Sequence, residues 1–253
     1  MTYGGMPYLM ALDSDEEKVS YLKGLFENVY LTDVLERRKL INDKVILEDL
    51  LDMISSSIGS LKNPTKLANA FQSVKHISIT SKTIDRYLDY FEDAFVINKV
   101  KRYDIKGKGY LESPLKYYFK DVGLRNARLN FRQQEENHIM ENIIYNELCL
   151  RGYCVDVGIL EHSIRNVDGK SQRVQQEVDS IANKGSNRYY IQSAFVISDE
   201  SKRKQETDVF RRIPDSFKKI VVIRENIVPW HDDNGILYIG VERFLLDETA
   251  MDL

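Results

Sequence analysis

The chain has 253 residues, of which 43% are hydrophobic and 30% are charged, and its formal net charge is -3 at pH 7. This length is sufficient for a sizeable core and favours two modest domains over one. No apolar run approaches the length of about 18 residues that a membrane span requires, and the net charge gives no global attraction to nucleic acid. The composition therefore predicts a helix-rich globular protein without a membrane segment.

The cysteines and the amino terminus bear on the cellular compartment. Only Cys149 and Cys154 are present, which indicates reduced thiols rather than a disulfide framework. The amino terminus lacks a basic stretch followed by the apolar core of a signal peptide. We therefore expect a cytoplasmic protein.

Residues 1–42 are predicted to form a helical segment. A loop precedes Ser14, and acidic residues directly after this serine are typical of the first turn of a helix. Apolar residues then recur every three or four positions from Glu16 to Leu40, with an interruption near Tyr30–Thr32. We expect an amphipathic helix broken at that point.

Residues 43–128 have the pattern of a winged helix-turn-helix. Three amphipathic helical patterns begin near Lys44, Pro64 and Ser81, and Asn63 is a candidate N-cap for the second. A strand at 94–103, a basic glycine turn at 104–110 and a second strand near 115–119 follow. In this fold the third helix commonly enters the major groove of DNA.

The distribution of charge in this predicted winged helix favours the hairpin, rather than the third helix, as the element that contacts nucleic acid. Acidic residues outnumber Lys82 and Arg86 on the third helix, which argues against deep insertion between phosphates. Basic residues dominate the hairpin. We therefore expect either non-specific DNA contact or contact with a protein, and the candidate nucleic-acid-binding residues are Lys82, Arg86, Lys99, Lys101, Arg102, Lys106 and Lys108.

Residues 129–253 are predicted to form a small α/β domain. A helical pattern at 135–151 ends at Gly152 and precedes a strand at 153–160, a polar turn at Asp168–Gly169 and a hairpin at 175–198. A charged helix to about residue 212 and two strands, at 218–224 and 236–241, complete the pattern. This order is typical of a sheet with helices packed against it.

The hairpin at 175–198 carries the candidate chemistry. Its turn, Asn183–Asn187, is rich in residues that tolerate positive φ. Because side chains alternate along a strand, Glu177 and Asp179 share one face of the first strand. Gln192 and Ala194 likewise share one face of the second strand.

Several segments together resemble the C-terminal half of a prokaryotic family of AAA-type ATPases. They are, in chain order, GGMPYL, DVLER, ITSKTIDRYLDYFEDAFVI, KYYFKDVGLRNA, HIMENIIYNEL, EVDSIA, YYIQSAF and NGILYI. The resemblance implies a winged helix at 43–128 and a restriction-endonuclease-like domain of the PD-(D/E)xK type at 129–253. The phosphate-binding pattern G-x-x-x-x-G-K-[ST] is absent, so residues 1–42 resemble the tail of an ATPase domain that this chain lacks.

The same resemblance assigns roles to four residues. Glu141 matches the helix glutamate of the nuclease fold, Asp179 its metal-binding aspartate and Gln192 its second acid, whereas Ala194 stands where an active enzyme has lysine. Glu141 and Asp179 are therefore the candidate Mg²⁺ ligands, and Glu141, Asp179 and Gln192 the candidate catalytic residues. Glu177 is a candidate substitute for one missing charge. Lys184, in the hairpin turn, is the candidate substitute for the missing lysine.

The motif without its lysine predicts binding rather than catalysis. We expect a non-catalytic, regulatory module of an AAA-type ATPase that contacts DNA, a protein partner or its own ATPase domain through a degenerate nuclease-like site. We expect no cofactor in this chain unless the site binds Mg²⁺, and ATP only through the missing domain. The alternatives are a Mg²⁺-dependent DNA nuclease that uses Glu141, Asp179 and Gln192, and an oligomerisation module.

Overall fold

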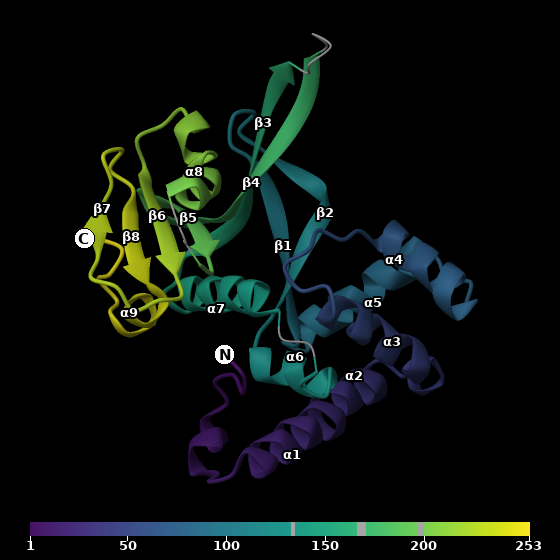
Figure 1. Cartoon of the computed structure of the whole chain (residues 1–253). Coiled ribbons are helices and arrows are strands. Elements are labelled where there is room, and N and C mark those ends of the chain that lie inside the picture. The colour runs from purple at the N-terminus through teal and green to yellow at the C-terminus, as the bar shows by residue number, and fades with distance from the viewer. Residues whose placement is uncertain (133–134, 166–170, 197–199) are drawn as a thin grey trace. The chain divides into compact units, whose positions relative to one another are not determined.

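The computed structural model describes residues 1–132, 135–165, 171–196 and 200–253 (Figure 1). The chain divides into two compact units. Unit 1 comprises Met1–Lys99 and Pro114–Asn142, and unit 2 comprises Val100–Ser113 and Ile143–Leu253. Within the described residues, no helix combines the length and apolar character needed to cross a membrane.

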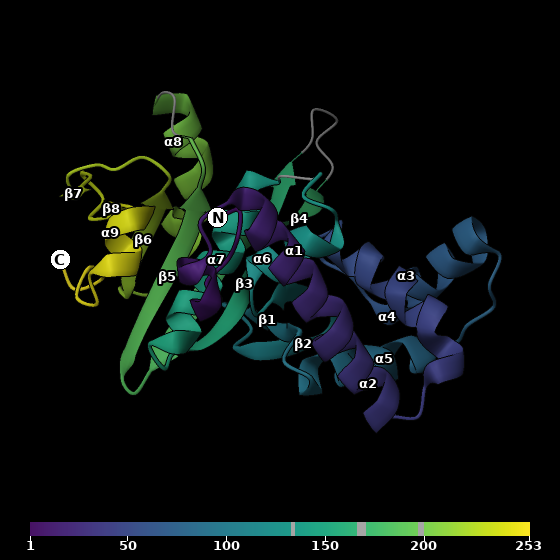
Figure 2. The same cartoon turned by 90° about the horizontal axis from the view of Figure 1, so that it is seen from below.

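Unit 1 begins with a helix that changes its winding partway along. Figure 2 shows α1 (Asp15–Leu25) followed by α2 (Thr32–Arg37), and the stretch Phe26–Leu31 between them is a π-helical turn. Ser14 and Glu17 form a capping box at the start of α1, since each side chain accepts a hydrogen bond from the other's backbone N–H. The predicted break near Tyr30–Thr32 is therefore confirmed as a local change in helix type.

Three further helices of unit 1 confirm the helical patterns expected there. They are α3 (Lys44–Ser55), α4 (Pro64–Ala70) and α5 (Ser81–Asp93). The Asn63 side chain accepts from the backbone N–H of Lys66 at 2.7 Å and the Thr80 hydroxyl from that of Thr83 at 3.1 Å, so α4 and α5 begin where their caps predict. Their apolar faces form one core with residues of α1 and α2.

The expected hairpin is present and extends into the large sheet. Strands β1 (Ile97–Asp104) and β2 (Gly109–Phe119) are followed by α6 (Val122–Arg128) and α7 (Glu136–Leu150). β1 pairs in parallel with β3 (Cys154–Arg165), with Arg102 opposite Val157. This pairing joins the hairpin of the predicted winged helix to the sheet of the following region.

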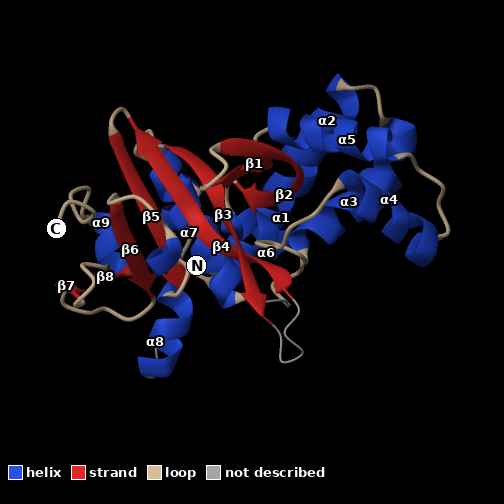
Figure 3. Ribbon diagram, turned by 90° about the horizontal axis from the view of Figure 1, so that it is seen from above, coloured by secondary structure: helices blue, strands red, loops and turns tan. Residues whose placement is uncertain are grey.

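Unit 2 contains most of a mixed sheet. Its remaining elements are β4 (Ser171–Lys184), β5 (Asn187–Ala194), α8 (Glu200–Thr207), β6 (Lys218–Ile223), β7 (Trp230–His231), β8 (Leu237–Gly240) and α9 (Val241–Leu246). Across the described residues the strand order is β2-β1-β3-β4-β5-β6-β8-β7. β3, β4 and β5 pair antiparallel, whereas β5, β6 and β8 run parallel (Figure 3).

The hairpin expected at 175–198 is confirmed as β4 and β5. Gly185 in its turn has a φ of 60°, the left-handed conformation that glycine adopts without strain. β4 starts at Ser171, earlier than the alternation predicted, and β5 ends at Ala194. The predicted turn at Asp168–Gly169 and the residues from 197 to 199 lie outside the described ranges.

Candidate functional site

Asp179 and Gln192 lie together where β4 and β5 stop pairing. The last paired residues of the ladder are Ser180 and Ile191. One residue beyond, an Asp179 carboxylate oxygen accepts a hydrogen bond from the Ser193 backbone N–H at 2.8 Å. The side-chain oxygen of Gln192 lies 3.5 Å from the Asp179 backbone nitrogen. The Asp179 carboxylate therefore takes the role of a backbone carbonyl and is held in place by the opposite strand.

Glu177 adds a second carboxylate to the same face of β4. Glu177 and Asp179 are both half-buried. Arg102, a buried residue of β1, lies within electrostatic range of Glu177. Burial lowers the pKa of Arg102, and the negative charge of Glu177 opposes this effect. Arg102 donates to the Ser113 carbonyl at 2.8 Å, while its Nε has no partner within the described part of the chain.

Glu141, on α7, belongs to a buried polar cluster of unit 1. The Lys116 ammonium lies 2.5 Å from its carboxylate, and the Tyr118 hydroxyl donates to the same oxygen. The other oxygen lies 3.5 Å from His138 Nδ1. Burial would raise the pKa of Glu141, but the Lys116 charge and the hydrogen bonds from His138, Lys116 and Tyr118 outweigh it, so the pKa is lowered. Glu141 is therefore an ionised carboxylate.

The place of the missing lysine is apolar. Ala194 is buried in the hydrophobic core of unit 2. Lys184, the candidate substitute, donates to the Arg151 carbonyl at 2.8 Å and lies 5.4 Å from the centre of the Tyr153 ring. Both contacts engage the Lys184 ammonium at the turn end of the hairpin.

The candidate nucleic-acid-binding residues differ in exposure. Lys99 is largely buried, and its ammonium lies 3.1 Å from Asp85 and 2.5 Å from Asp89, so its charge is balanced within unit 1. Arg102 is buried, as described above. The exposed members of the set are Lys82, Arg86, Lys101, Lys106 and Lys108.

Two basic residues, Lys116 and Arg125, have buried roles that the sequence did not predict. Lys116 is paired with Glu141, and Arg125 is fully enclosed. Arg125 donates from Nε to the Ser55 carbonyl at 2.8 Å and pairs with Glu135 at 3.1 Å. No local signal marks either residue, because the partners are 25 positions away for Lys116 and 70 for the Ser55 carbonyl.

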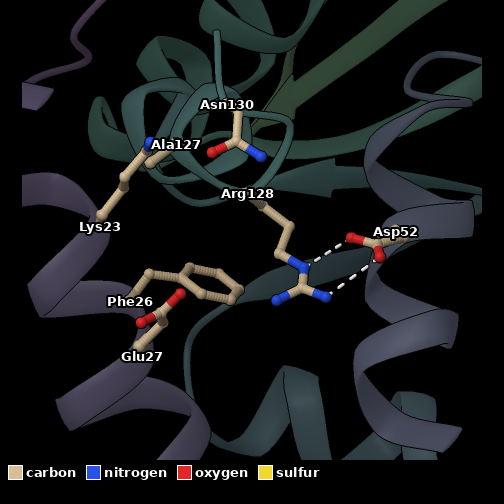
Figure 4. Close-up of a pocket in the computed structure, with 7 residues that line it drawn as sticks. All are labelled: Lys23, Phe26, Glu27, Asp52, Ala127, Arg128 and Asn130. Atoms are coloured by element: carbon tan, nitrogen blue, oxygen red, sulfur yellow. Dashed lines mark hydrogen bonds and ion pairs between the residues drawn. The ribbon is translucent and has the colours of Figure 1, made fainter. Parts of the chain in front are cut away.

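A cavity of about 180 Å³ in unit 1 contains none of these candidates (Figure 4). Arg128 forms a two-point ion pair with Asp52 on its wall, with N–O distances of 2.5 and 3.0 Å. That pair balances the charges of Arg128 and Asp52. It is lined by Lys23, Phe26, Glu27, Asp52, Ala127, Arg128 and Asn130.

Comparison with known proteins identifies relatives of unassigned function. A family model described as "Domain of unknown function (DUF8612)" matches residues 1–135. An "Uncharacterized protein" of Haemophilus influenzae (strain ATCC 51907 / DSM 11121 / KW20 / Rd) is 35% identical over 220 residues, which is 87% of this chain and 50% of that protein. "Uncharacterized protein MJ1544" of Methanocaldococcus jannaschii is 25% identical over 248 residues, which is 97% of this chain and 50% of that protein.

The chain thus spans about half the length of the curated relatives that it matches. Among solved structures, protein VC1899 from Vibrio cholerae aligns with 95% of this chain and 57% of that one. The sequence identity is 11% and the TM-score is 0.31, an overlap too slight to define the fold.

Proposed function

The chain belongs to the family described as "Domain of unknown function (DUF8612)", and from that premise we propose that it is a nucleic-acid-binding module with a divalent-cation site and an incomplete hydrolytic centre. One observation carries the proposal. Two half-buried carboxylates, Glu177 and Asp179, share a face of β4 beside Gln192, while Ala194 on β5 is buried in an apolar core.

The carboxylates suit a hard cation. Mg²⁺ and Mn²⁺ prefer oxygen ligands, and Asp179 is already oriented by its hydrogen bond from Ser193. The resemblance of the sequence also assigns Glu141, on α7, to this site as a candidate metal ligand. The neutral oxygen of Gln192 is a further candidate ligand.

Hydrolysis of a phosphodiester needs more than a bound metal. A positioned cation stabilises the charge that develops on the reacting phosphate, and its loss typically lowers the rate by orders of magnitude. Ala194 cannot supply that charge, and Lys184 is engaged at the other end of the hairpin. Binding without efficient cleavage is therefore the function that these residues support best.

The exposed lysines and arginine supply the affinity for nucleic acid. Contacts between Lys or Arg and phosphates release counterions and give sequence-independent binding. Lys101, Lys106 and Lys108 are exposed in the β1–β2 hairpin, and Lys82 and Arg86 on α5. We also propose that the whole protein is an AAA-type ATPase, because the motifs resemble the C-terminal half of that family and the relatives are about twice as long.

Titration calorimetry with Mn²⁺ tests the metal site directly. We expect wild type to bind Mn²⁺, and Glu177→Ala, Asp179→Ala and Glu141→Ala each to weaken binding. Glu112→Ala, which removes an exposed carboxylate from β2, is the matched control and should bind as wild type does. Wild type that binds no Mn²⁺, or variants that bind it unchanged, would remove the metal site from the proposal.

Mobility-shift and plasmid-cleavage assays test the proposed binding of nucleic acid without efficient cleavage. We expect DNA affinity that falls steeply with salt and little or no cleavage with Mg²⁺ or Mn²⁺. Wild type without salt-dependent affinity for single-stranded or duplex DNA would contradict the assignment of nucleic acid as the partner.

A second candidate function is Mg²⁺-dependent cleavage of DNA, and the buried ammonium of Lys116 beside Glu141 favours it. Lys116 lies outside the hairpin motif, but it provides a desolvated positive charge at a candidate metal ligand. In this case wild type cleaves plasmid DNA, and Lys116→Met and Asp179→Ala both abolish cleavage while Glu112→Ala does not. Absence of cleavage by wild type would exclude it.

A further inference from the structure

Five aromatic and cationic side chains of unit 2 form a row of contacts, called here the aromatic–cationic stripe, in the order Lys101, Tyr110, Tyr103, Arg188 and Phe217. The Lys101 ammonium lies 5.9 Å from the centre of the Tyr110 ring, whose centre is 5.4 Å from that of Tyr103. The Arg188 guanidinium lies 5.7 Å from the Tyr103 ring and 5.4 Å from the Phe217 ring. Each member therefore contacts the next.

The strand pairing of unit 2 explains how distant residues reach one surface. Lys101 and Tyr103 flank the buried Arg102 on β1, so both project from the opposite face of that strand. Arg188 is paired with Asn183 on β4, and the next residue of β5 is paired with the first residue of β6, directly after Phe217. β3 and β4 lie between β1 and β5 in the sheet, and the contact between Arg188 and the Tyr103 ring spans them.

Two rings of the stripe are exposed, and hydrogen bonds orient Tyr110 and Arg188. Tyr110 is 60% exposed and Phe217 is 41% exposed, so each presents part of its ring to solvent. The Tyr110 hydroxyl donates to Asp156 at 3.1 Å, and Arg188 donates to the Asn183 side chain at 2.8 Å. These bonds orient the stripe without covering it, so a ligand would meet a preorganised surface.

We propose that the aromatic–cationic stripe binds single-stranded nucleic acid, with unpaired bases stacked on Tyr110 and Phe217 and phosphates held by Lys101 and Arg188. This inference rests on the proposed function, since it names the form of nucleic acid and its site. Lys106 and Lys108, exposed in the β1–β2 turn next to Tyr110, extend the positive charge along the path of a strand.

The chemistry of the stripe selects this partner over others. A base has a π-face that stacks on an aromatic ring whatever its sequence, and single-strand binders combine such rings with a basic groove. A duplex buries its base faces and would use only the cations. An acidic peptide would use the cations but leave the exposed rings without a stacking partner.

Fluorescence anisotropy with the full chain and three labelled probes tests the inference. The probes are oligo(dT) of about 16 nucleotides, an abasic strand of the same length and a hairpin duplex. We expect wild type to bind oligo(dT) at least about tenfold more tightly than the abasic strand, because stacking is lost without bases. Tyr110→Ala combined with Phe217→Ala should lower oligo(dT) affinity by about tenfold or more.

Two controls separate stacking from loss of fold. Tyr110→Phe combined with Phe217→Tyr keeps both rings and should bind as wild type does. Tyr8→Ala removes a tyrosine of unit 1 that is 57% exposed, and it should leave affinity unchanged. Circular dichroism of each variant establishes that the fold is retained.

The outcomes distinguish the two proposals. Equal affinity for oligo(dT) and the abasic strand, or an alanine double variant that binds as wild type does, would contradict single-strand binding by the stripe. Either result would leave the proposed nucleic-acid binding of the chain unaffected. Tighter binding to the duplex, or equal binding to polyglutamate, also overturns it. Wild type that binds none of the DNA probes overturns both proposals.

Discussion

The ammonium of Lys116 and the carboxylate of Glu141 lie 2.5 Å apart, and their side chains are only 3% and 8% exposed. Removing two ions from water is costly, and the attraction between them offsets that cost only when the geometry is good and the remaining hydrogen-bonding capacity is satisfied. Here the Tyr118 hydroxyl and His138 supply further contacts to the carboxylate. The pair is therefore sensitive to the loss of either partner.

Lys116→Met should destabilise the chain by about 3–5 kcal/mol, because it leaves the Glu141 charge buried without its cation. Urea unfolding monitored by circular dichroism measures the change. Lys66→Met, which removes an exposed lysine from α4, is the control and should change the free energy of unfolding by no more than about 0.5 kcal/mol. Adding Glu141→Leu to Lys116→Met should restore part of the loss. Equal effects of Lys116→Met and Lys66→Met would contradict the buried pair.

His138 should make unfolding depend on pH. Its hydrogen bond to Glu141, opposed by burial, raises the pKa of His138 in the folded chain. A folded-state pKa above the unfolded value stabilises the protein fully below about pH 6.5, and this contribution is lost as pH rises through the folded-state pKa. Wild type should therefore lose stability relative to His138→Asn as pH rises through the range above about 6.5. A difference between the two proteins that stays constant across that range would exclude this linkage.

Lys99 and the lysines of the β1–β2 turn should differ in their effect on DNA affinity. Lys99 is already paired with Asp85 and Asp89, so Lys99→Ala should leave the dependence of affinity on salt unchanged. Lys106→Ala combined with Lys108→Ala should reduce the slope of log affinity against log salt by about two. The measurement is a mobility shift repeated at several salt concentrations. A larger loss from Lys99→Ala than from the double variant would reverse the assignment.

The Asp179 carboxylate should contribute to metal binding beyond its charge. Asp179→Asn keeps a side-chain oxygen that can accept from the Ser193 N–H, so the hairpin should remain intact while Mn²⁺ binding weakens by an order of magnitude or more. Asp179→Ala should weaken Mn²⁺ binding and also lower the thermal midpoint. Calorimetry and thermal unfolding of both variants separate the two roles. A Mn²⁺ affinity of Asp179→Asn equal to that of wild type would show that the charge is not used.

Local signals explain which parts of the fold could be predicted. The β4–β5 hairpin follows from period-two alternation around a turn of Asn, Gly and Ser, and the starts of α4 and α5 follow from Asn63 and Thr80. The parallel pairing of β1 with β3 depends on residues more than 50 positions apart, such as Arg102 and Val157, and no local pattern encodes it. That pairing explains why the hairpin of the predicted winged helix continues into the large sheet.

The candidate site also contains residues that local sequence patterns could place and residues that they could not. Alternation along β4 and β5 is enough to place Glu177, Asp179 and Gln192 on their strands, and the structure brings Asp179 and Gln192 together. The burial of Lys116 could not be predicted, because a lysine in a basic run is usually exposed. Its partner, Glu141, was itself identified as a candidate metal ligand and catalytic residue, not as the partner of a buried lysine. The sequence around a charged residue does not indicate an ion-pair partner that is distant in the chain.

The hydrogen bond from Ser193 to Asp179 couples the end of the hairpin to whatever the carboxylate binds. A cation at Asp179 would draw electron density away from the oxygen that accepts from this amide, and the amide proton would respond in its chemical shift and its exchange with solvent. The backbone of Ser193 is therefore an internal reporter of occupancy at the carboxylate. It can be read by nuclear magnetic resonance without a substrate, a product or any catalytic turnover.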